Sequence, residues 1–254
     1  MTAHAPVAER PQGLSAAYLL WGLVFLIIAL IVQAPASLLK KALPANLPVQ
    51  LEAFGGTIWN GQANWQQGPD EGQLRWQLRP LALLGGKLSA DIETLGSVQL
   101  HARAGVGLGG SWTVENLSGV IPGALVQRFL PPGWELPGDY RAQNVSVARA
   151  KFNQGAWKLA GGSLHWAGGS MHYSINGQAQ GATLPPLVLN LRLDNDVLAL
   201  NLLEETGSLG LGSLRLSADN MLETQLRQRL LGYTPNYHGQ GAPDQVVVTA
   251  KQPL

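Results

Sequence analysis

The chain contains no cysteine and few charged residues. Without cysteine it forms no disulfide, iron–sulfur cluster or thiol-based active site, although this absence leaves the cellular compartment open. The 17 Lys and Arg and the 16 Asp and Glu make up 13% of the residues and leave a net charge of +1. That is about half the usual charged fraction, and it provides no basic patch for nucleic acid. The 31 glycines and 8 tryptophans instead favour short strands joined by tight turns.

One long hydrophobic run lies near the start of the chain. No charged residue lies between Arg10 and Lys40, and Leu14 to Val32 is almost purely apolar. As a helix this run covers about 28 Å, close to the roughly 30 Å hydrocarbon core of a bilayer. We therefore predict a single transmembrane helix over residues 14–32. A cleaved signal peptide is the alternative, because an A-x-A pattern follows at residues 34–36, but signal peptides usually have a shorter apolar region of about 7–15 residues.

The predicted helix divides the chain into four parts. Residues 1–13 form a polar tail, residues 33–48 a proline-containing linker, and residues 49–254 a large β-rich domain. Lys and Arg near the two ends of the helix do not decide its orientation, since Arg10 precedes it while Lys40 and Lys41 follow it.

Alternation of apolar and polar residues dominates the region after the linker. It predicts antiparallel strands with one buried face. The clearest apolar positions are Leu74, Trp76 and Leu78, then Leu88, Ala90 and Ile92, and later Leu187, Leu189, Leu191 and Leu193. Turn signals separate these runs, at residues 55–56, 68–72, 85–86, 109–110, 161–162, 168–169 and 194–196. We expect a curved antiparallel sheet, either an open groove or a sandwich, in which Trp76 and Trp112 are core residues.

Three short segments extend this picture. Residues 122–130 predict a short helix that ends at Pro131. Residues 219–231 predict a second helix, because apolar residues recur at helical spacing between an N-cap at Asp219 or Asn220 and a stop at Gly232. Residues 246–248, three valines, predict a last strand.

The candidate catalytic patterns are weak. Residues 105–110 fit G-x-G-x-x-G, but a strand follows them in place of the helix that a dinucleotide site needs, so they predict a turn. His165 and His172 flank a hairpin without an acidic residue or cysteine nearby in the sequence. The two N-x-S triplets at 116–118 and 144–146 match the N-glycosylation acceptor sequence, but a pattern this short is expected by chance. We therefore predict no enzyme, no cofactor and no metal site.

Two sequence blocks resemble a known family. The first is Gly56-Thr57-Ile58-Trp59-Asn60-Gly61-Gln62-Ala63, preceded by Leu43-Pro44-Ala45, and the second is Leu74-Arg75-Trp76-Gln77-Leu78-Arg79-Pro80. Placed after a hydrophobic helix, they resemble the N protein of the general secretion pathway, the type II secretion system of Gram-negative bacteria. The resemblance covers residues 43–92 closely and 117–216 more loosely, and it does not extend to 217–254.

The resemblance implies a non-catalytic accessory subunit of the secretion system. It implies a cytoplasmic tail at 1–13, one span of the inner membrane, a periplasmic domain at 49–254, and contacts with other inner-membrane secretion proteins. From these blocks we predict a partner-docking motif, and its residues are Gly56, Thr57, Trp59, Gly61, Arg79 and Pro80. Core packing is the alternative role for Trp59.

A more distant resemblance to AsmA-like proteins implies a different function. In those proteins a curved antiparallel sheet forms an open groove with an apolar interior. This chain would then bind or transfer phospholipid in the cell envelope, and the leucines at 187, 189, 191 and 193 would face the groove. Alternation alone does not distinguish a filled core from an open groove.

Overall fold

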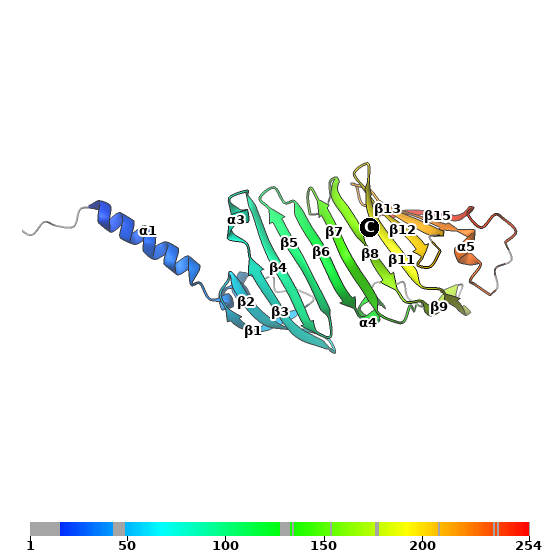
Figure 1. Cartoon of the computed structure of the whole chain (residues 1–254), viewed down its shortest axis with the longest axis horizontal. Coiled ribbons are helices and arrows are strands. Elements are labelled where there is room, and N and C mark those ends of the chain that lie inside the picture. Colours follow the sequence, from blue (N-terminus) through cyan, green and yellow to red (C-terminus); the bar gives the residue numbers. More distant parts are fainter. Residues whose placement is uncertain are drawn as a thin grey trace, which may run out of the picture.

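A computed structural model describes residues 16–42, 49–127, 133, 135–152, 154–175, 178–207, 209–235, 237 and 239–253. An N-terminal helix leads into one long curved sheet (Figure 1). The helical elements are α1 (Ala16–Val32), η1 (Ala36–Leu38), α2 (Leu39–Ala42), α3 (Pro80–Leu83), α4 (Gly123–Gln127) and α5 (Gln228–Leu231). The strands are β1 (Gln50–Gly56), β2 (Asn60–Gln67), β3 (Asp70–Leu78), β4 (Lys87–Gly96), β5 (Gln99–Gly107), β6 (Trp112–Ile121), β7 (Tyr140–Arg149), β8 (Trp157–Trp166), β9 (Gly169–Ile175), β10 (Gln178–Leu184), β11 (Leu187–Asp194), β12 (Val197–Glu204), β13 (Gly210–Leu216), β14 (Met221–Arg227) and β15 (Val246–Pro253).

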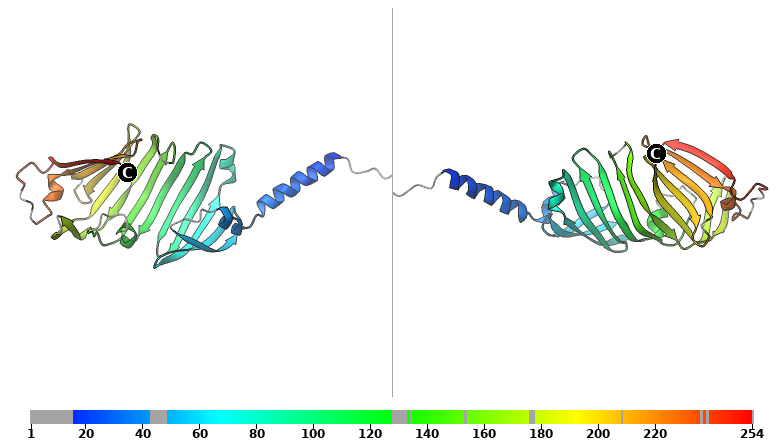
Figure 2. Two further views of the ribbon diagram at one scale, coloured as in Figure 1. Left: turned by 180° about the vertical axis from the view of Figure 1, so that it is seen from behind. Right: turned by 45° about the horizontal axis from the view of Figure 1, so that its top comes forward.

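The main sheet is an antiparallel meander of 13 strands. Its order follows the chain from β1 to β15, except that β8 pairs directly with β11 and the hairpin β9–β10 forms a separate two-stranded sheet. The sheet is open, with β1 and β15 as its two edges. The predicted antiparallel sheet is confirmed in its open form, because one curved layer is present in the described part of the chain and not two packed sheets (Figures 1 and 2).

One face of this sheet is apolar from end to end. Cross-strand register places Trp76 opposite Ile92, and it places Leu189 between Leu164 and Leu202. We call this side the apolar face, and its central residues are Trp76, Ile92, Ala102, Val114, Val147, Leu164, Leu189, Leu202, Leu214 and Thr224. The other side, the polar face, includes Arg75, Glu93 and His101 and the row Ser163, Asn190, Asn201, Ser213, Gln225 and Thr249.

Aligned bulges bend the central strands. Asn116 in β6 and Asn144 in β7 adopt left-handed backbone angles, with φ of 54° and 49°, where the pairing of β6, β7 and β8 shifts register. The predicted turn at 161–162 is wrong, because both glycines lie inside β8. Gly162, with φ of 91°, faces the Asn144 carbonyl so closely that a side chain there would collide with the backbone. A bulge uses glycine for the same reason as a turn does, so the sequence signal was ambiguous.

The C-terminal half of the sheet curls strongly. Arg149 Nη2 at the end of β7 donates a 2.9 Å hydrogen bond to the carbonyl of Ala218 in the β13–β14 turn, and Gly155 N donates to the same oxygen at 2.9 Å. On a flat sheet, four strand spacings from β7 to β13 would separate them by about 19 Å. Figure 2 shows the curvature of the sheet in this half.

The predicted helix at 219–231 is wrong over most of its length. Residues 221–227 form β14, paired on both sides with β13 and β15, and only the four residues of α5 are helical. Leu222, Thr224 and Leu226 alternate onto the apolar face, so their spacing fits a strand as well as a helix. The short helix predicted at 122–130 is confirmed as α4, with 128–130 outside the described residues, and the strand predicted at 246–248 is confirmed as the start of β15.

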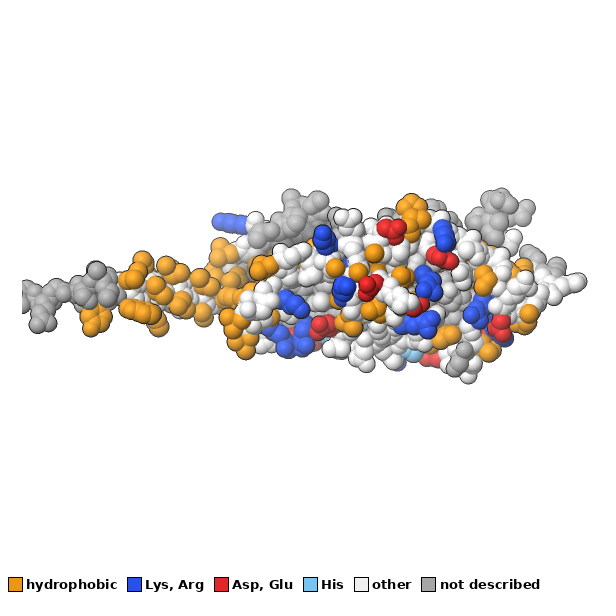
Figure 3. All heavy atoms as spheres, turned by 90° about the horizontal axis from the view of Figure 1, so that it is seen from above, with side chains coloured by type: hydrophobic (Ala, Val, Ile, Leu, Met, Phe, Trp, Pro, Cys, Tyr) orange, Lys and Arg blue, Asp and Glu red, His pale blue; other side chains and the backbone are white. Residues whose placement is uncertain are grey.

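Helix α1 extends away from the sheet with most of its described side chains exposed. Tyr18 and Trp21 are about 70% and 72% exposed, and Figure 3 shows α1 as a band of apolar side chains. In the described part of the chain, no helix has both the length and the apolar character needed to cross a membrane, and α1 has 17 residues. Residues 1–13 of the predicted tail and Leu14 lie outside the described residues, while the predicted linker contains the short helices η1 and α2.

Candidate functional site

The predicted docking motif contacts the end of α1. Trp59 Nε1 donates a 2.9 Å hydrogen bond to the carbonyl of Ile31, and Ile58 N donates at 2.9 Å to the carbonyl of Ala34. An isolated antiparallel bridge joins Thr57 to Pro35. The loop between β1 and β2 thus holds the polypeptide as it leaves the helix.

The loop itself is tightly folded. Thr57 N donates to the Asn60 carbonyl at 2.9 Å, and Asn60 N donates back to Thr57 Oγ1 at 3.1 Å. A Cβ at Gly61 would stand 2.7 Å from the Thr57 carbonyl oxygen and 2.5 Å from the ring of Trp76, so only glycine fits there. Trp76, expected in the core, is partly buried and supports the loop through Nε1, which donates to the Ile58 carbonyl at 3.0 Å.

The structure brings the two halves of the predicted motif together. Leu78 N donates a 2.7 Å hydrogen bond to the Trp59 carbonyl, which places Arg79 and Pro80 beside the β1–β2 loop. Pro80 opens α3, and Arg79 points onto the polar face, where Nε donates to Asp91 Oδ2 at 2.7 Å.

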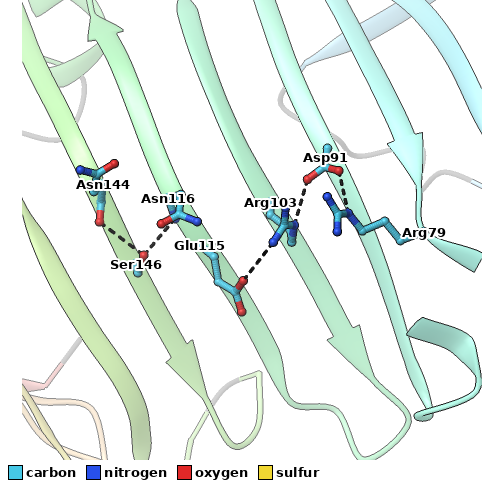
Figure 4. Close-up of polar contacts among 7 residues, drawn as sticks. All are labelled: Arg79, Asp91, Arg103, Glu115, Asn116, Asn144 and Ser146. Atoms are coloured by element: carbon cyan, nitrogen blue, oxygen red, sulfur yellow. Dashed lines mark hydrogen bonds and ion pairs between the residues drawn. The ribbon is translucent and has the colours of Figure 1, made fainter. Parts of the chain in front are cut away.

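A ladder of alternating charge crosses the polar face from there. Arg79 and Arg103 both bind Asp91, Arg103 Nε at 2.9 Å, and Arg103 also approaches Glu115 at 3.9 Å (Figure 4). Partial burial raises the pKa of Asp91, but hydrogen bonds and charge from the two arginines outweigh it and leave that pKa below its usual value. The ladder joins β4, β5 and β6 to Arg79, the residue that follows β3, and fits a structural role.

The two N-x-S triplets form a reciprocal pair across β6 and β7. Ser146 Oγ accepts a hydrogen bond of 2.9 Å from the backbone N–H of Asn116 (Figure 4). Ser118 Oγ accepts one of 2.9 Å from the backbone N–H of Asn144. Each serine hydroxyl also donates at 3.3 Å to the backbone carbonyl of the asparagine two residues before it in the chain. These hydrogen bonds partner the backbone groups that the bulges remove from the ladder.

The histidines have acidic partners that the sequence did not reveal. His165 Nδ1 lies 2.9 Å from Glu205 Oε1, and His172 Nδ1 lies 3.9 Å from Glu135 Oε2. Both carboxylates are far from the histidines in the sequence, so the fold and not the local sequence brings them together. In the described residues no group of three or more metal-ligating side chains forms around either histidine.

The apolar face forms a groove in the C-terminal half of the sheet. Its volume is about 860 Å³, and β9–β10 and α5 provide part of its wall. The lining residues are Leu136, Tyr140, Leu164, Trp166, Met171, Tyr173, Gln180, Leu184, Leu187, Leu189, Leu202, Leu214, Thr224, Leu226, Leu230, Leu231, Thr234 and Tyr237. Four of these lining residues, Tyr140, Trp166, Leu184 and Leu187, form the buried core of this region together with Leu211.

The sequence identified part of this groove. Leu187 and Leu189 line it as expected for the leucine-rich strand, while Leu193 lies near the far end of β11 and is 39% exposed. The aromatic wall of Tyr140 and Trp166 was missed, although both fall on the alternation of their strands. They are cross-strand partners on β7 and β8, and their approach depends on this register, which no local pattern encodes.

Comparison with known proteins identifies the family of this chain. A family model described as type II secretion system (T2SS), protein N, matches residues 48–237. The chain belongs to this family. The type II secretion system protein N of Vibrio cholerae serotype O1 is 35% identical over 159 residues, which cover 58% of this chain and 61% of that protein. No solved structure matches the chain.

Membership of the T2SS protein N family confirms the resemblance identified in the sequence. The family match also extends beyond the predicted limit at 216, into β14 and α5.

Proposed function

We propose that this chain is a non-catalytic accessory subunit of a type II secretion system. It is attached to the inner membrane through residues 14–32, and its sheet makes protein contacts in the periplasm. The observation that carries this proposal is the family match over residues 48–237, which includes nearly all of the sheet.

The exposed surface of α1 supports membrane attachment. Its side chains are apolar throughout, and Phe25 and Leu30 are about 75% and 64% exposed. Such a surface is better solvated by lipid than by water. A reporter that is active only in the cytoplasm, fused after Leu254, should stay inactive; activity there would overturn the proposed topology.

The docking motif and the free sheet edge are the proposed contact surfaces. The motif surrounds the point where the chain leaves α1, so a membrane-bound partner beside α1 would meet it first. At the other end, all eight residues of β15 are exposed, and an edge strand offers unpaired backbone groups to a partner strand. Asn60 is an exposed position in the motif, and Asn60→Arg should reduce recovery of secretion partners while protein abundance stays unchanged.

Photocrosslinking in cells tests the proposal directly. Crosslinking amino acids at Gln62 and Asn190 would sample two distant parts of the polar face, while Leu211, which is fully buried, provides a silent control. We expect adducts with inner-membrane secretion components at one or both polar-face positions. Adducts only with unrelated envelope proteins, or equal signals at all three positions, would contradict the accessory role.

Lipid binding is a second candidate function, favoured by one observation. The apolar face continues across all 13 strands, and in its C-terminal half it encloses the groove described above. An apolar face of this extent needs a covering layer or a ligand.

A further inference from the structure

The groove has the size and composition of a ligand site. Its volume of about 860 Å³ lies within the range of small-molecule pockets. None of its described lining residues carries a charge, and fifteen of the eighteen are Leu, Met, Trp or Tyr. Of the polar groups, the Tyr173 hydroxyl already binds Gln180 at 3.1 Å, and the Tyr140 hydroxyl lies 3.5 Å from the Leu136 carbonyl.

The groove walls are unsuited to a peptide. They consist mainly of strand faces, whose backbone N–H and C=O groups are used within the sheet. A peptide lying in the groove would bury its own amide groups without partners, which costs free energy for each one. A hydrocarbon chain has no such groups, and it gains by leaving water.

The side chains that line the groove do not fill it. Leu189, Leu202 and Leu214 are only partly buried although they lie in central strands, whereas Leu187, at the start of β11, is buried. At the rim of the sheet, Arg149 donates hydrogen bonds to Ala218 and Asn220 in the turn at 218–220 and lies over the ring of Trp157, and these contacts hold the sheet in its curl. The groove is therefore kept open by the backbone and does not depend on a ligand for its shape.

We propose that this groove binds an acyl chain of a membrane phospholipid, with the head group outside in water. The inference rests on the second proposed function and gives it a location and a ligand class. Phospholipid is the source because α1 presents an apolar surface to its surroundings, which places the sheet beside a bilayer if the proposed attachment holds. The uncharged lining fits the hydrocarbon part of the lipid alone.

Photoactivatable phospholipid tests this site in the full chain. The purified chain is reconstituted in vesicles containing phosphatidylethanolamine with a diazirine on one acyl chain, irradiated, and digested for mass spectrometry. We expect adducts on groove peptides from β11 to α5. The double variant Leu202→Trp/Leu214→Trp fills the groove and should lower these adducts at least ten-fold.

Matched variants keep the outcome clear. Leu159→Trp lies on the polar face, opposite Ala148, and should leave the groove adducts unchanged. If the double variant fails to fold, Leu214→Phe alone should still give a measurable reduction. Groove adducts that remain unchanged in the filling variants would overturn the proposal. In a second experiment, a crosslinking amino acid replaces Leu214 in cells, and adducts with protein alone, without lipid, would also overturn it.

The pattern of adducts separates this inference from the proposed attachment. Adducts on both α1 and the groove support both proposals. Adducts on α1 without the groove overturn the acyl-chain site and leave the attachment standing. Adducts in the groove without α1 support the site and contradict attachment through α1, whereas no adduct on either overturns both.

Discussion

Trp59 Nε1 donates a hydrogen bond of 2.9 Å to the backbone carbonyl of Ile31, which lies 28 residues earlier in the chain. Ile31 belongs to the last turn of α1, where carbonyl groups have no partner within the helix. The tryptophan therefore caps the helix from the sheet. Together with the bridge between Pro35 and Thr57, it fixes the direction in which the sheet leaves α1.

Replacing Trp59 with Phe should loosen this junction. The variant keeps an aromatic ring but lacks the indole N–H donor, and the loss of one such hydrogen bond costs about 1 kcal/mol. Because the chain has no cysteine, a pair of cysteines introduced at Leu20 and Gln62 would carry the two spin labels without competing sites. We expect a broader distance distribution between them in Trp59→Phe, and an unchanged one in Trp21→Phe on the exposed side of α1.

The motif shows how far the sequence alone could lead. The block at 56–63 identified the family and marked glycines that the backbone requires, as Gly61 confirms. It could not show that Trp59 binds Ile31, because that contact depends on the path of residues 33–35. Whether a partner also docks there stays a prediction, and Gly61→Arg is unsuited to test it, since the side chain would displace the loop.

The sheet could be predicted wherever the residues of a single strand determine its structure. Alternation identified the faces of β3 and β11, but β14 matched a helix equally well, and its pairing with β13 and β15 decided the result. The groove was beyond prediction, because it depends on the curl that brings Arg149 to Ala218. Curl arises from bulges and rim contacts between residues distant in the sequence.

The paired bulges at Asn116 and Asn144 give a second prediction. Asn116 has φ of 54°, which asparagine and glycine tolerate and β-branched residues do not. Asn116→Gly should leave the urea midpoint of unfolding nearly unchanged, whereas Asn116→Val should lower the free energy of unfolding by roughly 1–2 kcal/mol. Equal midpoints for the two variants would show that the bulge does not constrain β6.

The serine partners of these bulges can be tested separately. Ser146→Ala removes the acceptor of the Asn116 N–H, and Ser118→Ala removes that of Asn144. Each should cost about 0.5–1.5 kcal/mol. Because the two pairs join the same strands, the double variant should lose less than the sum of the single losses, as a double-mutant cycle in urea would measure.

Asp91 should make stability depend on pH in a defined range. Its pKa is lower in the folded chain than in the unfolded one, so the ionised form stabilises the fold above the unfolded pKa of roughly 3.9. This contribution is lost as the pH falls through the folded pKa. Asp91→Asn should therefore cost less than about 1 kcal/mol at pH 7, since the carboxylate is partly exposed, and nothing at the acidic limit.

Salt and a control variant complete that experiment. Screening at about 1 M salt should reduce the difference between Asp91→Asn and the parent chain. Glu52→Gln, at an exposed position of β1, should show a smaller difference at pH 7. A difference that persists unchanged from pH 7 to the acidic limit would show that Asp91 acts through its shape and not its charge.

Arg149 should be the most sensitive polar residue of the sheet. It is 6% exposed, and its guanidinium donates to the carbonyls of Gly155 and Ala218 at 3.1 and 2.9 Å and to Asn220 Oδ1 at 2.7 Å. It also lies 4.8 Å from the centre of the Trp157 ring. These contacts join the β7–β8 loop to the β13–β14 turn across the curl.

Lysine provides a charge without this geometry, because an ammonium group cannot reproduce the fork of a guanidinium. Arg149→Lys should lower the free energy of unfolding by about 2 kcal/mol, and Arg149→Leu by more, since buried carbonyls then lose their donor. Hydrogen exchange should rise at 155–157 and 216–220 in both variants. Arg192→Lys, on the exposed polar face, is the matched control and should change neither measurement. If Arg149→Lys unfolds at the parental midpoint, the curl is maintained by the strands themselves and the rim contacts are incidental.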